Sequence, residues 1–295
     1  MTTRFIANSA SRNPGGTAIR TLIALLVLAL LAAAGGTLFI YFGVYNVAAT
    51  EQHTGPVYWL MHVAMRRSVQ QRAKHIAVPP LDERATIERG FRLYEANCEI
   101  CHGGPGVAPD AIALGLTPLP ANLAHTALHW EPAELFWVIK HGIKMAGMPA
   151  WEFRLPEPDL WAIVAFLQEL PKLTPLQYKA IAQSLREVDA EAVPSLPDAT
   201  PGRGDVERGK TAVYQYACVT CHKIPGIVGA NAPVGPPLDK IATRVFIAGT
   251  LPNTPENMIR WLRSPLAVNP KTAMPDLRVT ERDAWDIAAY LYTLK

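Results

Sequence analysis

The sequence predicts an all-α protein, with two tandem helical domains after an N-terminal transmembrane helix. Three observations support this prediction. A long uncharged apolar run lies near the N-terminus, one cysteine motif occurs twice, and a similar helical pattern surrounds each copy. We expect a cytoplasmic N-terminus (1–20), an anchor (21–45), a periplasmic linker that includes a candidate interfacial helix (46–85), a first domain (86–175), a second linker (176–202) that includes a candidate short helix (177–188), and a second domain (203–295).

The apolar run is long enough to span a membrane. No charged residue occurs between Thr21 and Thr50, and about 20 apolar residues cross a bilayer. A cleaved signal peptide is the alternative, with Ala32–Ala34 as its cleavage site. Its apolar core usually has about 7–15 residues, whereas this run continues through Leu38–Phe42. The sequence therefore favours an uncleaved single-pass anchor.

Basic residues predict the orientation of this anchor. Arg4, Arg12 and Arg20 precede the span without an acidic residue among them, and the next basic residue is Arg66. The excess of Lys and Arg on the cytoplasmic side of membrane proteins then places the N-terminus in the cytoplasm. We expect a protein of the bacterial inner membrane whose domains lie in the periplasm.

The segment Val57–Lys74 combines aromatic, apolar and cationic residues. Three interpretations are open for it: a helix at the membrane interface, a helix that docks a partner, and a helix that packs on the first domain. The net charge of the chain is only +3, and no long basic run indicates nucleic-acid binding.

All four cysteines lie in two copies of a C-x-x-C-H motif, the attachment signature of c-type haem. In this motif two thiols bond to the macrocycle and the histidine ligates its iron. The residues are Cys98, Cys101 and His102 in the first copy, and Cys218, Cys221 and His222 in the second. The sequence therefore predicts two covalently bound haem c groups.

Two other uses of paired cysteines fit less well. A zinc site needs both pairs to converge on one metal from nearby positions, but Cys98 and Cys218 are 120 positions apart. A thioredoxin-like pair needs a βαβ context and no adjacent histidine.

The surroundings of the two motifs form an internal repeat. Each copy contains an upstream Glu-Arg-Gly, an aromatic residue four positions before the first cysteine, and a closing helix with apolar residues at helical spacing. The matching pairs are Glu88–Gly90 with Glu207–Gly209, Tyr94 with Tyr214, and Trp161–Leu167 with Trp285–Leu291.

Gly90, Tyr94 and Cys98, at intervals of four, resemble the N-terminal helix of class I cytochromes c. The resemblance implies that the glycine lets the N-terminal and C-terminal helices cross closely, and that the aromatic residue packs in the crossing. In the second copy Gly209 lies one residue further from its cysteines, so we expect a slightly different crossing.

The second axial ligand of each iron is predicted to be a methionine. In the second domain Met274 precedes Pro275 in a loop, as the ligand does in class I cytochromes, whereas Met258 lies in a helical pattern typical of core residues. In the first domain Met148 precedes Pro149 in a similar loop. Met145 and His141 are the alternatives there, and His125 and His129 are weaker ones.

The resemblance also implies a backbone acceptor for each proximal histidine. Gly235-Pro236-Pro237-Leu238 matches the Gly-Pro-x-Leu pattern, so Pro236 is expected to accept a hydrogen bond from His222. The first domain departs from this pattern, and Pro118–Leu123 is its nearest candidate segment.

Two six-coordinate haems predict an electron carrier rather than an enzyme. We expect single-electron transfer between respiratory partners, such as a dehydrogenase, a quinol-oxidising complex or a terminal oxidase, and no small-molecule substrate. A haem-bearing subunit of a cbb3-type or other terminal oxidase is the alternative, and a dihaem peroxidase is a weaker one.

The two domains differ in charge. Residues 86–180 hold 7 basic and 10 acidic residues, a net charge of −3, whereas residues 201–295 hold 12 and 8, a net charge of +4. Because complementary potentials steer encounters between redox proteins, we expect the second domain to face an acidic partner.

Overall fold

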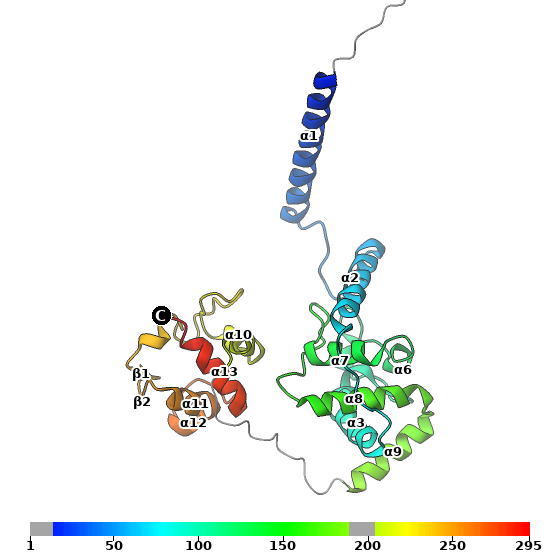
Figure 1. Cartoon of the computed structure of the whole chain (residues 1–295), viewed down its shortest axis with the longest axis vertical. Coiled ribbons are helices and arrows are strands. Elements are labelled where there is room, and N and C mark those ends of the chain that lie inside the picture. Colours follow the sequence, from blue (N-terminus) through cyan, green and yellow to red (C-terminus); the bar gives the residue numbers. More distant parts are fainter. Residues whose placement is uncertain (1–13, 189–203) are drawn as a thin grey trace, which may run out of the picture. The chain divides into compact units, whose positions relative to one another are not determined.

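The structure, a computed structural model, describes residues 14–188 and 204–295. The chain divides into two units, Met1–His53 and Thr54–Lys295. Almost all regular structure in the described residues is helical (Figure 1), which confirms the predicted fold class. Arg4, Arg12 and residues 189–202 of the expected second linker lie outside the described residues.

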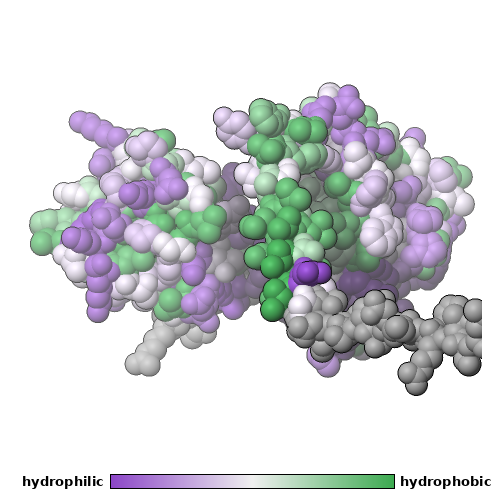
Figure 2. Space-filling model, turned by 90° about the horizontal axis from the view of Figure 1, so that it is seen from above, coloured by the Kyte–Doolittle hydropathy of each residue, from purple (hydrophilic) through white to green (hydrophobic). Residues whose placement is uncertain are grey.

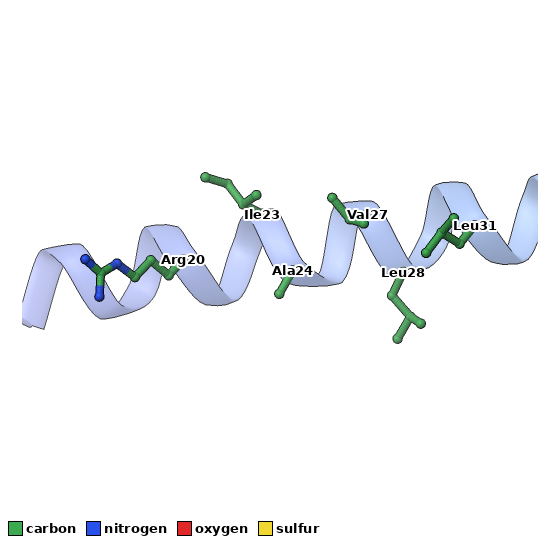
Figure 3. Close-up of a pocket in the computed structure, with 6 residues that line it drawn as sticks. All are labelled: Arg20, Ile23, Ala24, Val27, Leu28 and Leu31. Carbon is green, nitrogen blue, oxygen red and sulfur yellow. The ribbon is translucent and has the colours of Figure 1, made fainter.

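The first unit contains helix α1 (Pro14–Tyr41), followed by Gly43 at a φ of +60°. The helix is long and apolar enough to cross a membrane. Its exposed side chains are mostly large and apolar, and in Figure 2 they form a strongly hydrophobic surface. Figure 3 shows apolar side chains such as Ile23 and Val27 along the helix, beside the guanidinium of Arg20. These properties fit a membrane anchor and also a signal sequence.

The second unit begins with helix α2 (Gly55–Ala73), which packs on α7 (Pro132–His141). Arg66 joins the two helices: its guanidinium lies 2.9 Å from the Glu134 carboxylate and 4.1 Å from the centre of the Trp130 ring. Near the start of α2, Tyr58 and Trp59 are exposed. The later part of this helix therefore packs on the first domain, which is one of the three interpretations of Val57–Lys74.

The first helical domain is built around the crossing of α3 (Arg84–Asn97) and α8 (Glu157–Glu169). Three shorter helices connect them, in addition to α7. These are α4 (Glu99–His102), α5 (Ala111–Leu114) and α6 (Leu123–Thr126), and the 3-10 helix η1 (Leu170–Lys172) follows α8.

Gly90 permits the close crossing of α3 and α8, as expected. A Cβ atom on Gly90 would lie 1.9 Å from the carbonyl oxygen of Ala162, so any larger residue would separate the helices. Tyr94 is buried in the crossing against Phe166, with ring centres 5.2 Å apart, and its hydroxyl donates to the carbonyl of Gly103 at 2.6 Å. The aromatic residue thus connects the helix crossing to the cysteine motif.

Helix α9 (Pro175–Val188) lies in the segment for which the sequence predicts a linker. Its side chains Tyr178, Ala182 and Leu185 are buried in the core of the first domain. Burial of these apolar groups stabilises the docked helix. Helix α9 therefore packs as part of the first domain.

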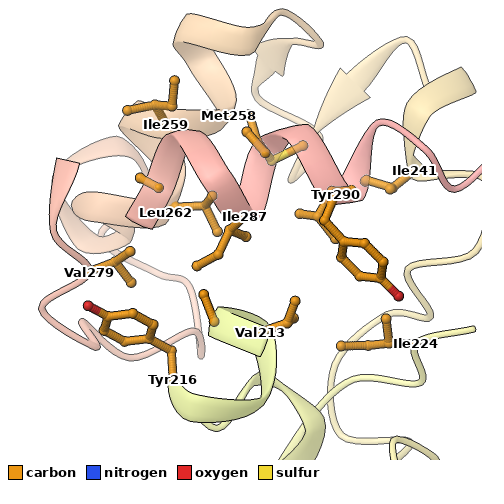
Figure 4. Packing of buried hydrophobic residues seen from close by; sticks show 14 of the residues in the cluster. Val213, Tyr216, Ile224, Ile241, Met258, Ile259, Leu262, Val279, Ile287 and Tyr290 are labelled. Carbon is orange, nitrogen blue, oxygen red and sulfur yellow. The ribbon is translucent and has the colours of Figure 1, made fainter. Parts of the chain in front are cut away.

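The second domain repeats the arrangement with α10 (Val206–Gln215) crossing α13 (Glu281–Leu291). The connecting elements are the 3-10 helices η2 (Cys218–Thr220) and η3 (Ile241–Thr243), the paired strands β1 (Phe246–Ile247) and β2 (Leu251–Pro252), and the helices α11 (Pro255–Arg263) and α12 (Pro265–Val268). Figure 4 shows Val213, Met258 and Ile287 converging in its core.

Tyr214 does not pack in the helix crossing of the second domain as Tyr94 does in the first, so the expected equivalence of these two residues is wrong. A Cβ atom on Gly209 would lie 1.9 Å from the Asp286 carbonyl, the same clearance that Gly90 has. Because Gly209 is one residue further from the cysteines, the side chain one helical turn after it is Val213, which is buried, whereas Tyr214 is 57% exposed. Ala217, at a φ of +56°, accommodates the additional residue before Cys218.

Two candidate haem sites

The first cysteine motif forms one helical turn directly after α3. Its turn is closed by backbone hydrogen bonds from Cys101 and His102 to the Cys98 carbonyl, at 3.0 and 2.9 Å. Both thiols consequently lie on one short segment, as attachment to a single macrocycle requires. Burial raises the pKa of the Cys98 thiol to about 12.

The ring of His102 is fixed by a backbone carbonyl. Its Nδ1 atom donates to the carbonyl oxygen of Ala121 at 2.7 Å, which leaves Nε2 free to bind a metal. Burial lowers the pKa of His102, while the bond to Ala121 opposes this shift, so the neutral imidazole is favoured. Ala121 lies in the expected segment, although the sequence did not single it out.

A cavity of about 420 Å³ adjoins this histidine. Its walls include Tyr94, Leu123 and Leu170 together with the glycine-rich turn Gly103–Gly106. Polar and apolar groups contribute equally to its lining, and it reaches the imidazole of His102.

The candidate ligand Met148 lies at the base of a tight loop. Ile143 and Met148 form a bridge at which the Ile143 N–H donates to the Met148 carbonyl at 3.3 Å, and Gly142 and Gly147 both have φ values of +66°. Met148 is half-buried against the core, whereas Met145 lies within the loop and is 77% exposed. The two methionines of this loop therefore differ in their surroundings, because Met148 packs against the core and Met145 is exposed to solvent.

The histidine alternatives in the first domain have other neighbours. His141 packs against the Trp137 ring and lies 3.6 Å from the Glu152 carboxylate. His125 and His129 are exposed and face each other, with ring centres 4.7 Å apart.

In the second site, the segment Gly235–Leu238 runs beside the proximal histidine. The Nδ1 atom of His222 donates to the carbonyl of Pro236 at 2.8 Å, which confirms the expected acceptor. Two backbone bonds fasten the segment to the motif: Gly235 N–H to the Cys221 carbonyl at 2.7 Å, and Leu238 N–H to the Lys223 carbonyl at 2.8 Å.

Gly235 must be a glycine for this contact to form. A Cβ atom there would lie 2.5 Å from Cε1 of His222. The segment can approach the imidazole only because Gly235 has no side chain. Burial raises the pKa of the adjacent Cys218 thiol to about 11.

The two methionines of the second domain have different surroundings. Met258 is 2% exposed and belongs to the core that Figure 4 shows, as expected. Met274 is half-buried, and its N–H donates to the Thr272 hydroxyl at 3.1 Å within the loop before α13. Of these two, Met274 alone is held in a loop that follows the expected pattern.

The residues of each site fit a covalently bound haem. Each holds two thiols one turn apart, an imidazole whose Nδ1 is engaged by a carbonyl, and a half-buried methionine in a constrained loop. Cys98 and Cys218 border different hydrophobic cores, which is not the convergent arrangement of one zinc site.

Comparison with known proteins agrees with this chemistry. Residues 85–167 match the family described as cytochrome C oxidase, cbb3-type, subunit III, and residues 206–295 match the family described as cytochrome c. The chain is 30% identical over 125 residues to a cytochrome c oxidase subunit 2 from Alkalihalophilus pseudofirmus, and 31% identical over 132 residues to a quinohemoprotein alcohol dehydrogenase from Comamonas testosteroni.

These alignments cover 41% and 43% of this chain, but only 35% of the oxidase subunit and 18% of the dehydrogenase. The similarity therefore concerns the cytochrome part and not the whole of either relative. The chain contains two cytochrome c domains, each with its own C-x-x-C-H motif, which is the make-up of a dihaem c-type cytochrome.

Proposed function

We propose that this cytochrome is anchored in the bacterial inner membrane and transfers single electrons between respiratory partners in the periplasm. Helix α1 would supply the anchor, because it is uncharged after Arg20 and each of its described side chains is exposed. Covalent haem attachment belongs to the outer side of this membrane, which agrees with the orientation that the N-terminal arginines favour.

The carrier role rests chiefly on the proposed ligand pair at each iron. His102 with Met148 would hold one haem iron, and His222 with Met274 would hold the other. Haem supplies the redox chemistry, in which its iron accepts and returns one electron. The chain's part is to hold each imidazole by its carbonyl and each methionine by its loop, which leaves no open position for a substrate.

The ferric spectrum of the purified holoprotein tests this proposal. Methionine-ligated ferric haem has a weak absorption band in the far red, and we expect both haems to contribute to it. Met148→Ala and Met274→Ala should each remove part of the band. Appreciable turnover of hydrogen peroxide by the unaltered protein would instead favour a peroxidase and contradict the carrier.

Exposed cations around the second motif support an acidic partner for that domain. Lys223 directly follows His222, Lys271 precedes Met274 and Arg278 follows it, and all three are exposed. Electrostatic steering of this kind accelerates association by about 10–1,000-fold and weakens as ionic strength rises. The rate of reaction with an acidic redox protein should therefore fall with added salt. At low salt, Lys223→Glu should react more slowly than the unaltered protein, whereas Lys179→Glu on α9 should react at the same rate.

A fixed oxidase subunit is the second candidate, favoured by the match of residues 85–167 to the cbb3-type family. Extraction in mild detergent separates the two candidates. Stoichiometric copurification with an oxidase core would support the subunit, and isolation of the cytochrome alone would support a tethered carrier.

A further inference from the structure

The two cytochrome domains share one buried side chain. Phe153 follows the Met148 loop of the first domain, yet it is 5% exposed and belongs to the hydrophobic core of the second domain. Its ring lies edge-on to Tyr216, with ring centres 6.4 Å apart, and 4.7 Å below the guanidinium of Arg208. An aromatic side chain of one domain is therefore inserted into the other.

Ion pairs surround this ring. Arg208 binds the Glu152 carboxylate of the first domain at 2.9 Å, while its other nitrogens bind Asp283 and Asp286 of the second domain, also at 2.9 Å. Arg154 donates to the Gln215 carbonyl at 2.7 Å and lies 4.7 Å above the Tyr216 ring. Burial alone would lower the pKa of Arg208. The neighbouring carboxylates outweigh burial, so the net result is a raised pKa.

Comparison of the two repeats shows which of these contacts occur within a domain and which join the two domains. Arg89 occupies the position of Arg208 in the first domain and pairs with Asp159, as Arg208 pairs with Asp283. Both pairs fasten an N-terminal helix to a C-terminal helix within one domain. Only Arg208 has the additional contacts with Glu152 and Phe153, so these contacts serve the junction between the domains.

The junction adjoins both haem sites. On one side Trp151 and Glu152 are fastened to the end of α7 by N–H bonds to the Ile139 and Lys140 carbonyls, at 3.2 and 3.1 Å, directly after the Met148 loop. On the other side Tyr216 lies two positions before Cys218, and its hydroxyl donates to Asp283 at 2.7 Å.

We propose that Glu152, Phe153 and Arg208 form a latch that holds the two cytochrome domains in one arrangement and thereby fixes the separation between their haems. This inference rests on the proposed electron-carrier function. When both haems are bound, they would supply the one-electron redox chemistry, an electron passing from one to the other with no proton transfer or bond exchange. Phe153 and its neighbours are positioning residues for that step.

Distance measurement in the holoprotein tests the latch. Spin labels on Gln183→Cys of α9 and Ala267→Cys of α12 occupy exposed positions of the first and second domains. We expect one narrow distance distribution in the otherwise unaltered protein. It should be lost in Glu152→Arg, which repels Arg208, and in Phe153→Ala, and inter-haem electron transfer should slow in both variants.

Two matched controls break ion pairs within single domains. Glu157→Gln removes the partner of Lys140, and Arg89→Gln removes the partner of Asp159. Both should retain the narrow distribution. The latch is wrong if Glu152→Arg and Phe153→Ala retain it as well. The far-red band of methionine-ligated haem, recorded on the same samples, tests the proposed ligands separately: its absence from the unaltered protein would contradict those ligands whatever the distances show.

Discussion

The Tyr178 hydroxyl donates a hydrogen bond to the Glu99 carboxylate at 2.7 Å, which joins helix α9 to the first cysteine motif. Glu99 lies between the two haem-binding thiols, and Tyr178 packs on the Phe91 ring with centres 5.1 Å apart. The haem attachment turn of the first domain is therefore supported from outside the repeat.

Tyr178→Phe should lower the free energy of unfolding of the first domain by about 1 kcal/mol, because it removes this hydrogen bond and keeps the ring. Denaturant unfolding of the holoprotein measures the loss. Tyr214→Phe, which alters an exposed tyrosine of the second domain, should change the stability very little. Equal effects of the two substitutions would contradict a supporting role for Tyr178.

Met145 and Met148 should respond differently to substitution by alanine. We expect Met145→Ala to retain the whole far-red ferric band, since its side chain is 77% exposed. Met148→Ala should remove the share of the first haem and lower its reduction potential. Spectra and redox titration check both variants. Loss of part of the band in Met145→Ala, but not in Met148→Ala, would make Met145 the ligand.

Met258→Ala should destabilise the second domain without changing its haem ligands. Truncation of a buried methionine usually costs about 2–5 kcal/mol, and Met258 is 2% exposed in the core. Met274→Ala should show the opposite behaviour, with loss of the second haem's share of the ferric band and a smaller effect on unfolding. Thermal unfolding and the ferric spectrum of each variant separate the two roles.

Gly235→Ala should perturb the second haem, because the new Cβ would lie 2.5 Å from the His222 ring. Overpacking of this kind costs about 1–3 kcal/mol, and displacement of the imidazole should shift the reduction potential of that haem. Gly115→Ala is the matched control, since its Cβ would meet only the Ile112 carbonyl at 3.6 Å. A potential unchanged in both variants would show that Gly235 does not position His222.

His141 should make the first domain less stable in acid. Burial lowers its pKa from the ordinary value of 6.5, although the charge of Glu152 opposes this shift. The unfolded chain therefore binds a proton at a higher pH than the folded chain does, so stability is lost as the pH falls below 6.5. His141→Gln should weaken this dependence, measured as unfolding free energy against pH. Parallel curves would contradict the prediction.

The cofactor and the repeat could be predicted from the sequence because covalent chemistry and helical periodicity are local. C-x-x-C-H defines thiol spacing within a single turn, and Gly90 and Gly209 mark the helix crossings that the structure contains. Pro236 was predictable for the same reason, since its contact with His222 belongs to a short recurrent segment.

The packing of Tyr214 could not be predicted by matching its distance to the cysteines. Burial on a helix depends on angular position relative to the crossing glycine, and one additional residue rotates a side chain by about 100°. Val213 therefore takes the buried position, and the left-handed conformation of Ala217 restores the connection to Cys218.

The sequence by itself determined that the chain attaches two haems in two similar helical domains after an apolar helix. The tertiary structure alone decided which carbonyl holds His102, that α9 completes the first domain, and that Phe153 is buried in the second. These features join residues far apart in the sequence. Their formation depends on shape and burial after folding, for which no local spacing in the chain provides a signal.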